Sequence, residues 1–155
     1  MDKVFKIIFD LMVVLLIILL SIYFLLRICG IADIYKVKTG SMEDGIHAGD
    51  YILIYKKSTY RVGDIVTFKK DGYHVTHRII KKNGSKVVTK GDANNIEDEE
   101  ININSIIGKV IYTGGILNFL INYKFYIAGF LLFLYLISWY IEKNNESKKI
   151  VKNNK

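Results

Sequence analysis

Side chains capable of nucleophilic chemistry occur in three short segments of the sequence. Ser41 lies in the segment TGSM that begins at residue 39, His77 lies in YHVTHRII from residue 73, and Asp92 and Asp98 lie in KGDANNIED from residue 90. A serine hydroxyl is a weak nucleophile until a base removes its proton, and an imidazole is an effective base when a carboxylate orients it. The three segments therefore predict acyl-transfer chemistry at Ser41.

Other residues could take the same roles on the basis of type alone. His47 and His74 are alternative bases, and further carboxylates occur at Asp50, Asp64 and Asp71. Asp50 and Asp64 each stand at the start of an apolar run, where a turn or a cap is the more common role of an aspartate. Residue types alone leave the assignment of the base and its partner open.

A metal site is a competing interpretation of the three histidines. Imidazole is a common metal ligand, but side chains three positions apart on a strand point to opposite faces, so His74 and His77 should not converge. Cys29 is the only cysteine of the chain. One thiol excludes a disulfide framework and a Cys-rich zinc site, and we expect neither a metal nor a cofactor.

The middle of the chain should form the sheet that positions these residues. Ile, Val, Thr and aromatic residues dominate five short runs, at 50–55, 64–68, 73–80, 86–89 and 106–112. Asp71-Gly72 and Asn83-Gly84 separate successive runs, and such pairs accept the positive φ of tight hairpin turns. The pattern predicts a mainly β fold, built on a small antiparallel sheet or barrel over residues 29–115.

Two uncharged apolar segments flank this region, at 11–26 and 125–141. With their amphipathic flanks they reach the length of about 17–25 residues that a membrane-spanning helix needs. We predict one transmembrane helix at 7–28 and a second at 116–141 that starts at the membrane interface. Cleavage of the first segment as a signal peptide is not favoured, because its apolar stretch exceeds the usual ~7–15 residues and no A-x-A-like site follows.

The charge distribution predicts the orientation of these helices. The formal net charge of the chain is +7, and residues 142–155 carry five Lys and two Glu. Lysine near a span favours the cytoplasmic side, so residues 1–6 and the basic tail 142–155 should be cytoplasmic and residues 29–115 extracytoplasmic. Residues 31–115 are nearly balanced, with 13 basic and 11 acidic residues, which argues against nucleic-acid binding.

Four blocks in order resemble a known enzyme family. The segment TGSME at 39–43 followed by Gly49-Asp50 resembles the SGSMEP…GD block of type I signal peptidases, and RVGDIV at 61–66 looks like their RVGDIV strand. VTHRII at 75–80 and TKGDANN at 89–95 are similar to the VHRII and TKGDNN blocks of the endoplasmic-reticulum type. The paired spans resemble the SipW-like members.

The resemblance implies roles for individual residues. Ser41 falls on the nucleophile and His77 on the general base, while Asp98 is the first choice and Asp92 the second choice for the acidic member. The resemblance also implies an oxyanion site made by the Thr39 hydroxyl and the Ser41 N–H, and substrate contacts at Met42, Val75 and Thr76. Asp44 stands where the family has Pro, which restores an N–H and frees φ at that position.

The expected function is that of a membrane-bound serine endopeptidase that cleaves signal peptides from exported preproteins. Its expected partners are those preproteins and the lipid bilayer, and its expected location is the plasma membrane in preference to the endoplasmic reticulum. Two other classes fit parts of the pattern. A non-catalytic membrane-anchored binding or scaffold protein would need no reactivity at Ser41, and a small transporter component would need ionisable residues inside its spans.

Overall fold

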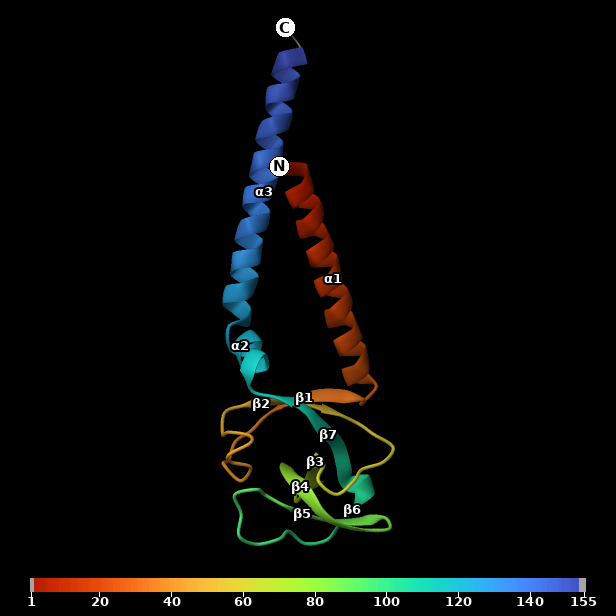
Figure 1. Cartoon of the computed structure of the whole chain (residues 1–155). Coiled ribbons are helices and arrows are strands. Elements are labelled where there is room, and N and C mark those ends of the chain that lie inside the picture. The colour runs from red at the N-terminus through yellow and green to blue at the C-terminus, as the bar shows by residue number, and fades with distance from the viewer. Residues whose placement is uncertain (1, 154–155) are drawn as a thin grey trace. The chain divides into compact units, whose positions relative to one another are not determined.

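The computed structural model describes residues 2–153, which form helices at both ends of the chain and a sheet between them (Figure 1). The helices are α1 (Asp2–Ile28), α2 (Gly115–Asn122) and α3 (Lys124–Asn153). The strands are β1 (Ala32–Lys36), β2 (Tyr51–Tyr55), β3 (Ile65–Lys70), β4 (Tyr73–Asn83), β5 (Lys86–Lys90), β6 (Ile101–Asn102) and β7 (Ile106–Thr113). A short 3-10 turn, η1 (Ile103–Ser105), joins β6 to β7.

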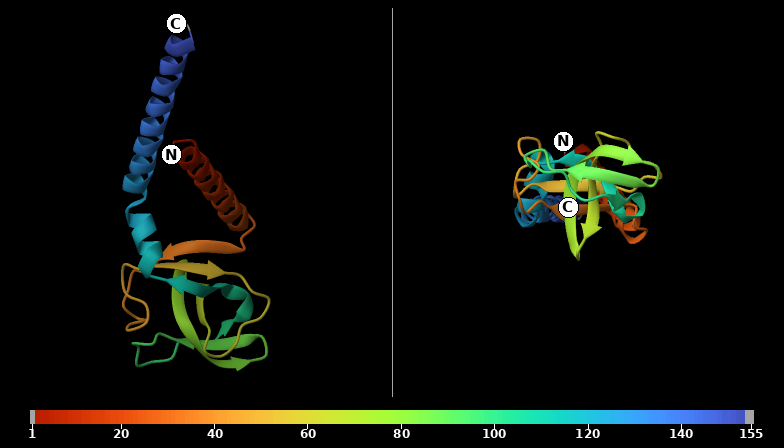
Figure 2. Two further views of the ribbon diagram at one scale, coloured as in Figure 1. Left: turned by 45° about the horizontal axis from the view of Figure 1, so that its top comes forward. Right: turned by 90° about the horizontal axis from the view of Figure 1, so that it is seen from below.

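The strands form one antiparallel sheet in the order β1-β2-β7-β3-β4-β5-β6. This confirms the predicted fold class, and all five predicted runs are strands. The two strands that the sequence pattern did not predict, β1 and β6, are the two edges of the sheet. Figure 2 shows that β4 runs across the direction of β2, as the right-handed twist between neighbouring strands requires when it accumulates over several strands.

The β3–β4 and β4–β5 connections are the two predicted hairpins. Lys70 pairs with Tyr73, so Asp71 and Gly72 make a two-residue loop, and both have positive φ, 50° and 82°. Positive φ at both central positions is the signature of a type I′ turn, whose twist matches that of the strands. The second hairpin turns at Gly84, where φ is 56°. These turns fix the register of β4, the strand that carries His77.

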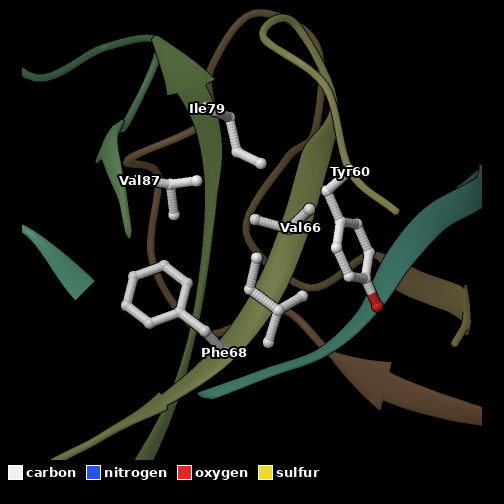
Figure 3. Close-up of a cluster of buried hydrophobic side chains, with 6 residues drawn as sticks. Tyr60, Val66, Phe68, Ile79 and Val87 are labelled. Carbon is white, nitrogen blue, oxygen red and sulfur yellow. The ribbon is translucent and has the colours of Figure 1, made fainter. Parts of the chain in front are cut away.

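The larger apolar cluster lies between the central strands. Its buried members are Tyr60, Val66, Phe68, Ile79, Val87 and Ile106, and Figure 3 shows five of them labelled around β3 and β4. On β4 and β5 buried residues alternate with more exposed ones, so Ile79 and Val87 point inward. Such alternation is expected where one face of a strand is packed on a core.

A second apolar cluster joins the β1–β2 connection to β2. Met42 and Ile46 come from the connection, while Ile52 and Ile54 come from β2, and all four are 1% exposed. Burying a large apolar side chain contributes about 1.5–3 kcal/mol relative to leaving it exposed. The connection that contains Ser41 is therefore held to the sheet at Met42 and Ile46 and is not a free loop.

The helices contain the two long apolar segments of the chain. Lys6–Ile28 within α1 and Lys124–Ile141 within α3 are each long and apolar enough to cross a membrane. The predicted second helix, 116–141, is interrupted at Tyr123, which separates α2 from α3. Helix α3 continues to Asn153, through all the described residues of the predicted basic tail. Residues 17–118, which include every strand, form one compact unit, and the remaining described residues form another.

Candidate active site

Ser41 lies in a tight turn between β1 and β2. The N–H of Glu43 bonds to the carbonyl of Gly40 at 3.1 Å, and the N–H of Ile46 bonds to the carbonyl of Met42 at 3.0 Å. The side chain of Met42, the next residue, is buried in the second apolar cluster. Local hydrogen bonds and a buried neighbour thus fix the backbone from which the Ser41 hydroxyl projects.

His77 lies on the inward face of β4 and reaches Ser41. It stands opposite Val66 of β3 in the register of the sheet, and its side chain is 8% exposed. The ring packs edge-on against Phe68, with 6.4 Å between the ring centroids. His77 Nε2 lies 3.1 Å from Ser41 Oγ, which is within hydrogen-bonding distance of the hydroxyl that a base must deprotonate.

The other nitrogen of His77 faces Asp98. Nδ1 lies 2.6 Å from Asp98 Oδ2, and the aspartate side chain is 20% exposed. A carboxylate on Nδ1 favours the tautomer in which Nδ1 carries the proton and Nε2 is free to accept one. Ser41, His77 and Asp98 thus form one continuous hydrogen-bonded series, in the geometry that nucleophilic catalysis by serine requires.

Asp92, the second candidate for the acidic member, has a different partner. Its oxygens accept hydrogen bonds from Arg78 Nε at 2.9 Å and Nη2 at 2.6 Å. This bidentate pairing adds geometric specificity to the charge attraction. Arg78 Nη1 also donates to the carbonyl of Gly63 at 3.0 Å. The hydrogen bonds that Arg78 donates to Asp92 raise the pKa of the Arg78 guanidinium. Asp92 therefore fastens its loop to β4 through Arg78.

The loop that holds Asp92 also supports the backbone of Ser41. The N–H of Ala93 donates to the Ser41 carbonyl at 3.0 Å. A Cβ added at Gly91 would lie 2.5 Å from that same carbonyl oxygen, a distance too short for a non-bonded contact. The close approach of the loop to the nucleophile therefore requires glycine at position 91.

The remaining predicted residues lie near this series in different environments. Thr39 Oγ1 is 3.5 Å from Ser41 Oγ and is exposed. Thr76 Oγ1 lies 2.9 Å from Thr67 Oγ1, and Val75 is half-buried against the larger apolar cluster. The Met42 side chain is 1% exposed, so only its backbone is available for the predicted substrate contact.

The alternative bases have other partners. His47 Nδ1 bonds to Glu43, and this hydrogen bond raises the pKa of His47. The His74 ring packs edge-on against Tyr35, with 4.7 Å between the ring centroids. Within residues 2–153 the three histidines thus lie in three separate environments, and no group of three His, Cys, Asp or Glu side chains that could hold a metal ion is found there.

Two residues near the Ser41–His77–Asp98 series were not predicted from the sequence as site residues. Arg78 is the partner of Asp92, and the buried Thr89 donates a hydrogen bond to Asp98 Oδ2 at 2.7 Å. A signal for Thr89 was present, because it stands two residues after Val87 and so shares the inward face of its strand. A polar residue on an apolar inward face needs a hydrogen-bonding partner.

Comparison with known proteins gives a family match and several similar proteins. The Peptidase S24-like family matches residues 31–111. The signal peptidase complex catalytic subunit SEC11C of Homo sapiens is 39% identical over 76 residues, covering 43% of this chain and 40% of that protein. The SEC11 subunits of Metarhizium acridum and Plasmodium falciparum are each 34% identical, over 79 and 74 residues, covering 45% and 43% of this chain and 46% and 40% of those proteins.

The chain spans less than half the length of each of these relatives, so the matches do not extend over the whole of those proteins. The family match is broader, since it spans more than half of the 155 residues and contains Ser41, His77 and Asp98. This protein is therefore a member of the Peptidase S24-like family, with sequence similarity to signal peptidase catalytic subunits.

Proposed function

We propose that this protein is a membrane-bound serine endopeptidase that removes N-terminal signal peptides from exported preproteins. The observation that carries the proposal is the hydrogen-bonded series from Ser41 through His77 to Asp98. The peptidase family and the names of the signal peptidase relatives support the choice of reaction and substrate. Two helices long enough to span a membrane support an anchored enzyme.

The proposed reaction is acyl transfer through a serine ester. His77 Nε2 accepts the proton of Ser41 Oγ as the oxygen attacks the scissile carbonyl carbon. His77 then gives this proton to the leaving amine, and the peptide bond breaks. A water molecule then gives a proton to the same nitrogen and attacks the ester carbon. The bond between this carbon and Ser41 Oγ breaks, the acyl peptide leaves with a new carboxyl group, and His77 returns the proton to Ser41 Oγ. Throughout this sequence Asp98 stabilises the positively charged imidazolium and keeps the ring oriented.

The negative charge on the carbonyl oxygen needs donors during both attacks. We propose the Ser41 N–H and the Thr39 hydroxyl, whose oxygen lies 3.5 Å from Ser41 Oγ. Donors placed where charge develops contribute about 2.7–4 kcal/mol each to transition-state stabilisation. Because the Thr39 side chain is exposed, its hydroxyl can turn toward the carbonyl oxygen of the substrate when substrate is bound.

The substrate would bind in extended form beside the nucleophile. An added peptide strand gains main-chain hydrogen bonds, while pockets for alternate side chains give selectivity. Val75 and Thr76 precede His77 on β4 and remain our candidates for contacts with substrate, together with the backbone of Met42. A signal peptide held in the same bilayer as the enzyme also raises its effective concentration at Ser41.

The membrane in which the protein works is part of the proposal. The plasma membrane expected from the sequence gains no support from the relatives, which come from an animal, a fungus and a malaria parasite and are named as subunits of a signal peptidase complex. These relatives favour the endoplasmic-reticulum membrane. Fractionation of membranes from the source cell, with markers for both membranes, distinguishes the two locations.

The proposal is tested by precursor processing with the full chain in reconstituted membranes. The Ser41→Ala variant should lose processing by roughly 10⁶-fold, to below detection, because removal of the nucleophile eliminates the acyl-enzyme route. Ser58→Ala is the matched control, since Ser58 is an exposed serine in the β2–β3 connection. It should process the precursor at the wild-type rate.

Two results would count against the proposal. Processing by Ser41→Ala at the wild-type rate would remove the serine mechanism. A folded wild-type protein that binds the precursor without cleaving it, at any pH between 5 and 9, would instead support the alternative of a non-catalytic membrane-anchored binding protein.

A further inference from the structure

Thr89 holds Asp98 through two hydrogen bonds. Its hydroxyl donates to Asp98 Oδ2 at 2.7 Å, and its carbonyl accepts the N–H of Asp98 at 2.8 Å. Thr89 is 0% exposed on the inward face of β5. The first bond fixes the carboxylate and the second fixes the backbone from which it projects, so this one residue restrains Asp98 at both ends of its side chain.

The hydroxyl of Thr89 and the ring of His77 share one acceptor. Both the Thr89 Oγ1 bond of 2.7 Å and the His77 Nδ1 bond of 2.6 Å end on Asp98 Oδ2. A hydroxyl has a single proton to donate, and here that proton is used on Asp98. Because the Asp98 side chain is partly exposed, water competes for its oxygens. A buried donor on Oδ2 therefore selects the rotamer that faces His77.

We propose that Thr89 is a positioning residue for the peptidase reaction, which keeps Asp98 Oδ2 against His77 Nδ1. This inference rests on the proposed function, because positioning Asp98 matters only if His77 acts as the base. Thr89 acts through Asp98 and His77 and does not contact the substrate. Its loss should therefore lower kcat and leave KM unchanged, since the interaction serves the transition state and not substrate binding.

The size of the effect follows from the type of hydrogen bond. A bond between a hydroxyl and an ionised carboxylate is stronger than one between neutral groups. Removing it from a partly buried carboxylate should lower kcat by about tenfold to a hundredfold. The reaction should not be abolished, because the His77–Asp98 bond and the Ser41 nucleophile both remain.

Two substitutions at position 89 separate the hydroxyl from the packing of the side chain. Thr89→Val keeps the branched shape and removes the donor, whereas Thr89→Ser keeps the donor and removes a methyl group from a buried site. If Thr89 positions Asp98, kcat falls in Thr89→Val and recovers to within about threefold of wild type in Thr89→Ser. A purely structural role predicts the reverse order, because the methyl deletion is the larger packing defect.

Thr113→Val is the matched control for the exchange of Thr for Val in this sheet. The Thr113 hydroxyl is buried and has no hydrogen-bonding partner within the described residues. This exchange should leave kcat and KM at their wild-type values. All variants are compared as full chains in detergent micelles at equal concentrations of folded protein, with a fluorogenic precursor peptide as substrate.

A spectroscopic measurement on the same samples reports the position of Asp98 directly. The proton on His77 Nδ1 in a short bond to a carboxylate gives a far-downfield proton resonance. This resonance should be present in wild type and Thr89→Ser, and broadened or lost in Thr89→Val. A stability loss elsewhere in the sheet would not move it at equal folded concentration.

The outcomes are distinguishable from failure of the proposed function. If Ser41→Ala still cleaves the peptide, the serine mechanism itself is wrong. If Ser41→Ala is inactive but Thr89→Val has wild-type kcat and an unchanged downfield resonance, only the positioning role of Thr89 is wrong. Equal losses of kcat in Thr89→Val and Thr89→Ser would also overturn it.

Discussion

The different partners of the two aspartates follow from the alternation of side chains on β4. His77 and Arg78 are neighbours on this strand, so they point to opposite faces. The His77 side chain is buried on the inward face of β4, where it bonds to Asp98. The Arg78 side chain is 38% exposed on the other face, where it pairs with Asp92. Two carboxylates six positions apart in one loop are thereby separated into one that orients an imidazole and one that neutralises a guanidinium.

This separation predicts different effects for two otherwise identical substitutions. Asp98→Asn should lower the rate of precursor cleavage by about 10³-fold to 10⁴-fold, because an amide can hold His77 in the wrong tautomer and cannot stabilise the imidazolium. Asp92→Asn should reduce cleavage far less at equal concentrations of folded protein, since it weakens an ion pair outside the Ser41–His77–Asp98 series. The measurement is kcat on a precursor peptide for both variants. A larger loss in Asp92→Asn would reverse the assignment.

At the scale of elements, the strands that carry the site were predictable from the sequence. Asp71-Gly72 encodes the β3–β4 turn locally, through residues that accept positive φ. The register of that hairpin then determines which face of β4 holds His77. Ser41 and His77 could therefore be selected on residue type and resemblance, and the alternation on β4 already separated His77 from His74.

The elements and partners that were not predicted depend on contacts distant in sequence. β1 is a five-residue edge strand with charged Asp33 and Lys36, and β6 has only two residues. Neither has the apolar periodicity that signals a strand.

The pairing of Arg78 with Asp92 spans 14 positions, and its geometry depends on how the loop folds back. The interruption at Tyr123 coincides with neither Gly nor Pro, the residues that usually mark the end of a helix.

An ion pair between Asp64, the residue just before β3, and Lys109 of β7 predicts acid sensitivity of the sheet. Lys109 Nζ donates to Asp64 Oδ1 at 2.5 Å. Burial raises the pKa of Asp64, but the hydrogen bonds from Lys109 and from the N–H of Arg61, together with nearby lysine charges, outweigh it, so the pKa is lowered overall. A carboxyl with a lowered folded-state pKa stabilises the fold above its unfolded pKa of about 3.9. That contribution is lost as the pH falls through the folded-state value.

Wild-type protein should therefore lose thermal stability more steeply below about pH 4 than Asp64→Asn, which has no such carboxyl to protonate. The measurement is the unfolding temperature in detergent micelles between pH 7 and pH 2.5, followed by near-UV circular dichroism. Asp71→Asn is the control, because it lies in the exposed β3–β4 turn where Asn also accepts positive φ. It should retain the wild-type acid sensitivity. Parallel curves for wild type and Asp64→Asn would contradict the role of this pair.

At the scale of the whole molecule, the two long apolar segments bear on where the proposed active site would lie relative to a membrane. The segments Lys6–Ile28 and Lys124–Ile141 are predominantly apolar and are not buried within the protein. Ser41 follows the end of α1 by only 13 residues, including the strand β1. The nucleophile therefore stays near the end of a helix that the hydrophobic effect would hold in a bilayer. Under the proposed function, a substrate confined to the same bilayer would need no long search to reach it.

The proposed topology requires the sheet and the end of α3 to lie on opposite sides of the membrane, and the single native thiol makes this measurable. In a Cys29→Ser background, Ser58→Cys reports on the β2–β3 connection and Asn144→Cys reports on the lysine-rich end of α3, both at exposed positions. In sealed vesicles a membrane-impermeant maleimide should label only one of the two, and permeabilisation should expose the other. Lysine near a span favours the cytoplasmic side, so position 144 should be the one accessible from the cytoplasm. Labelling of both positions from one side would mean that α3 does not cross the bilayer, because a single crossing by α3 necessarily separates them.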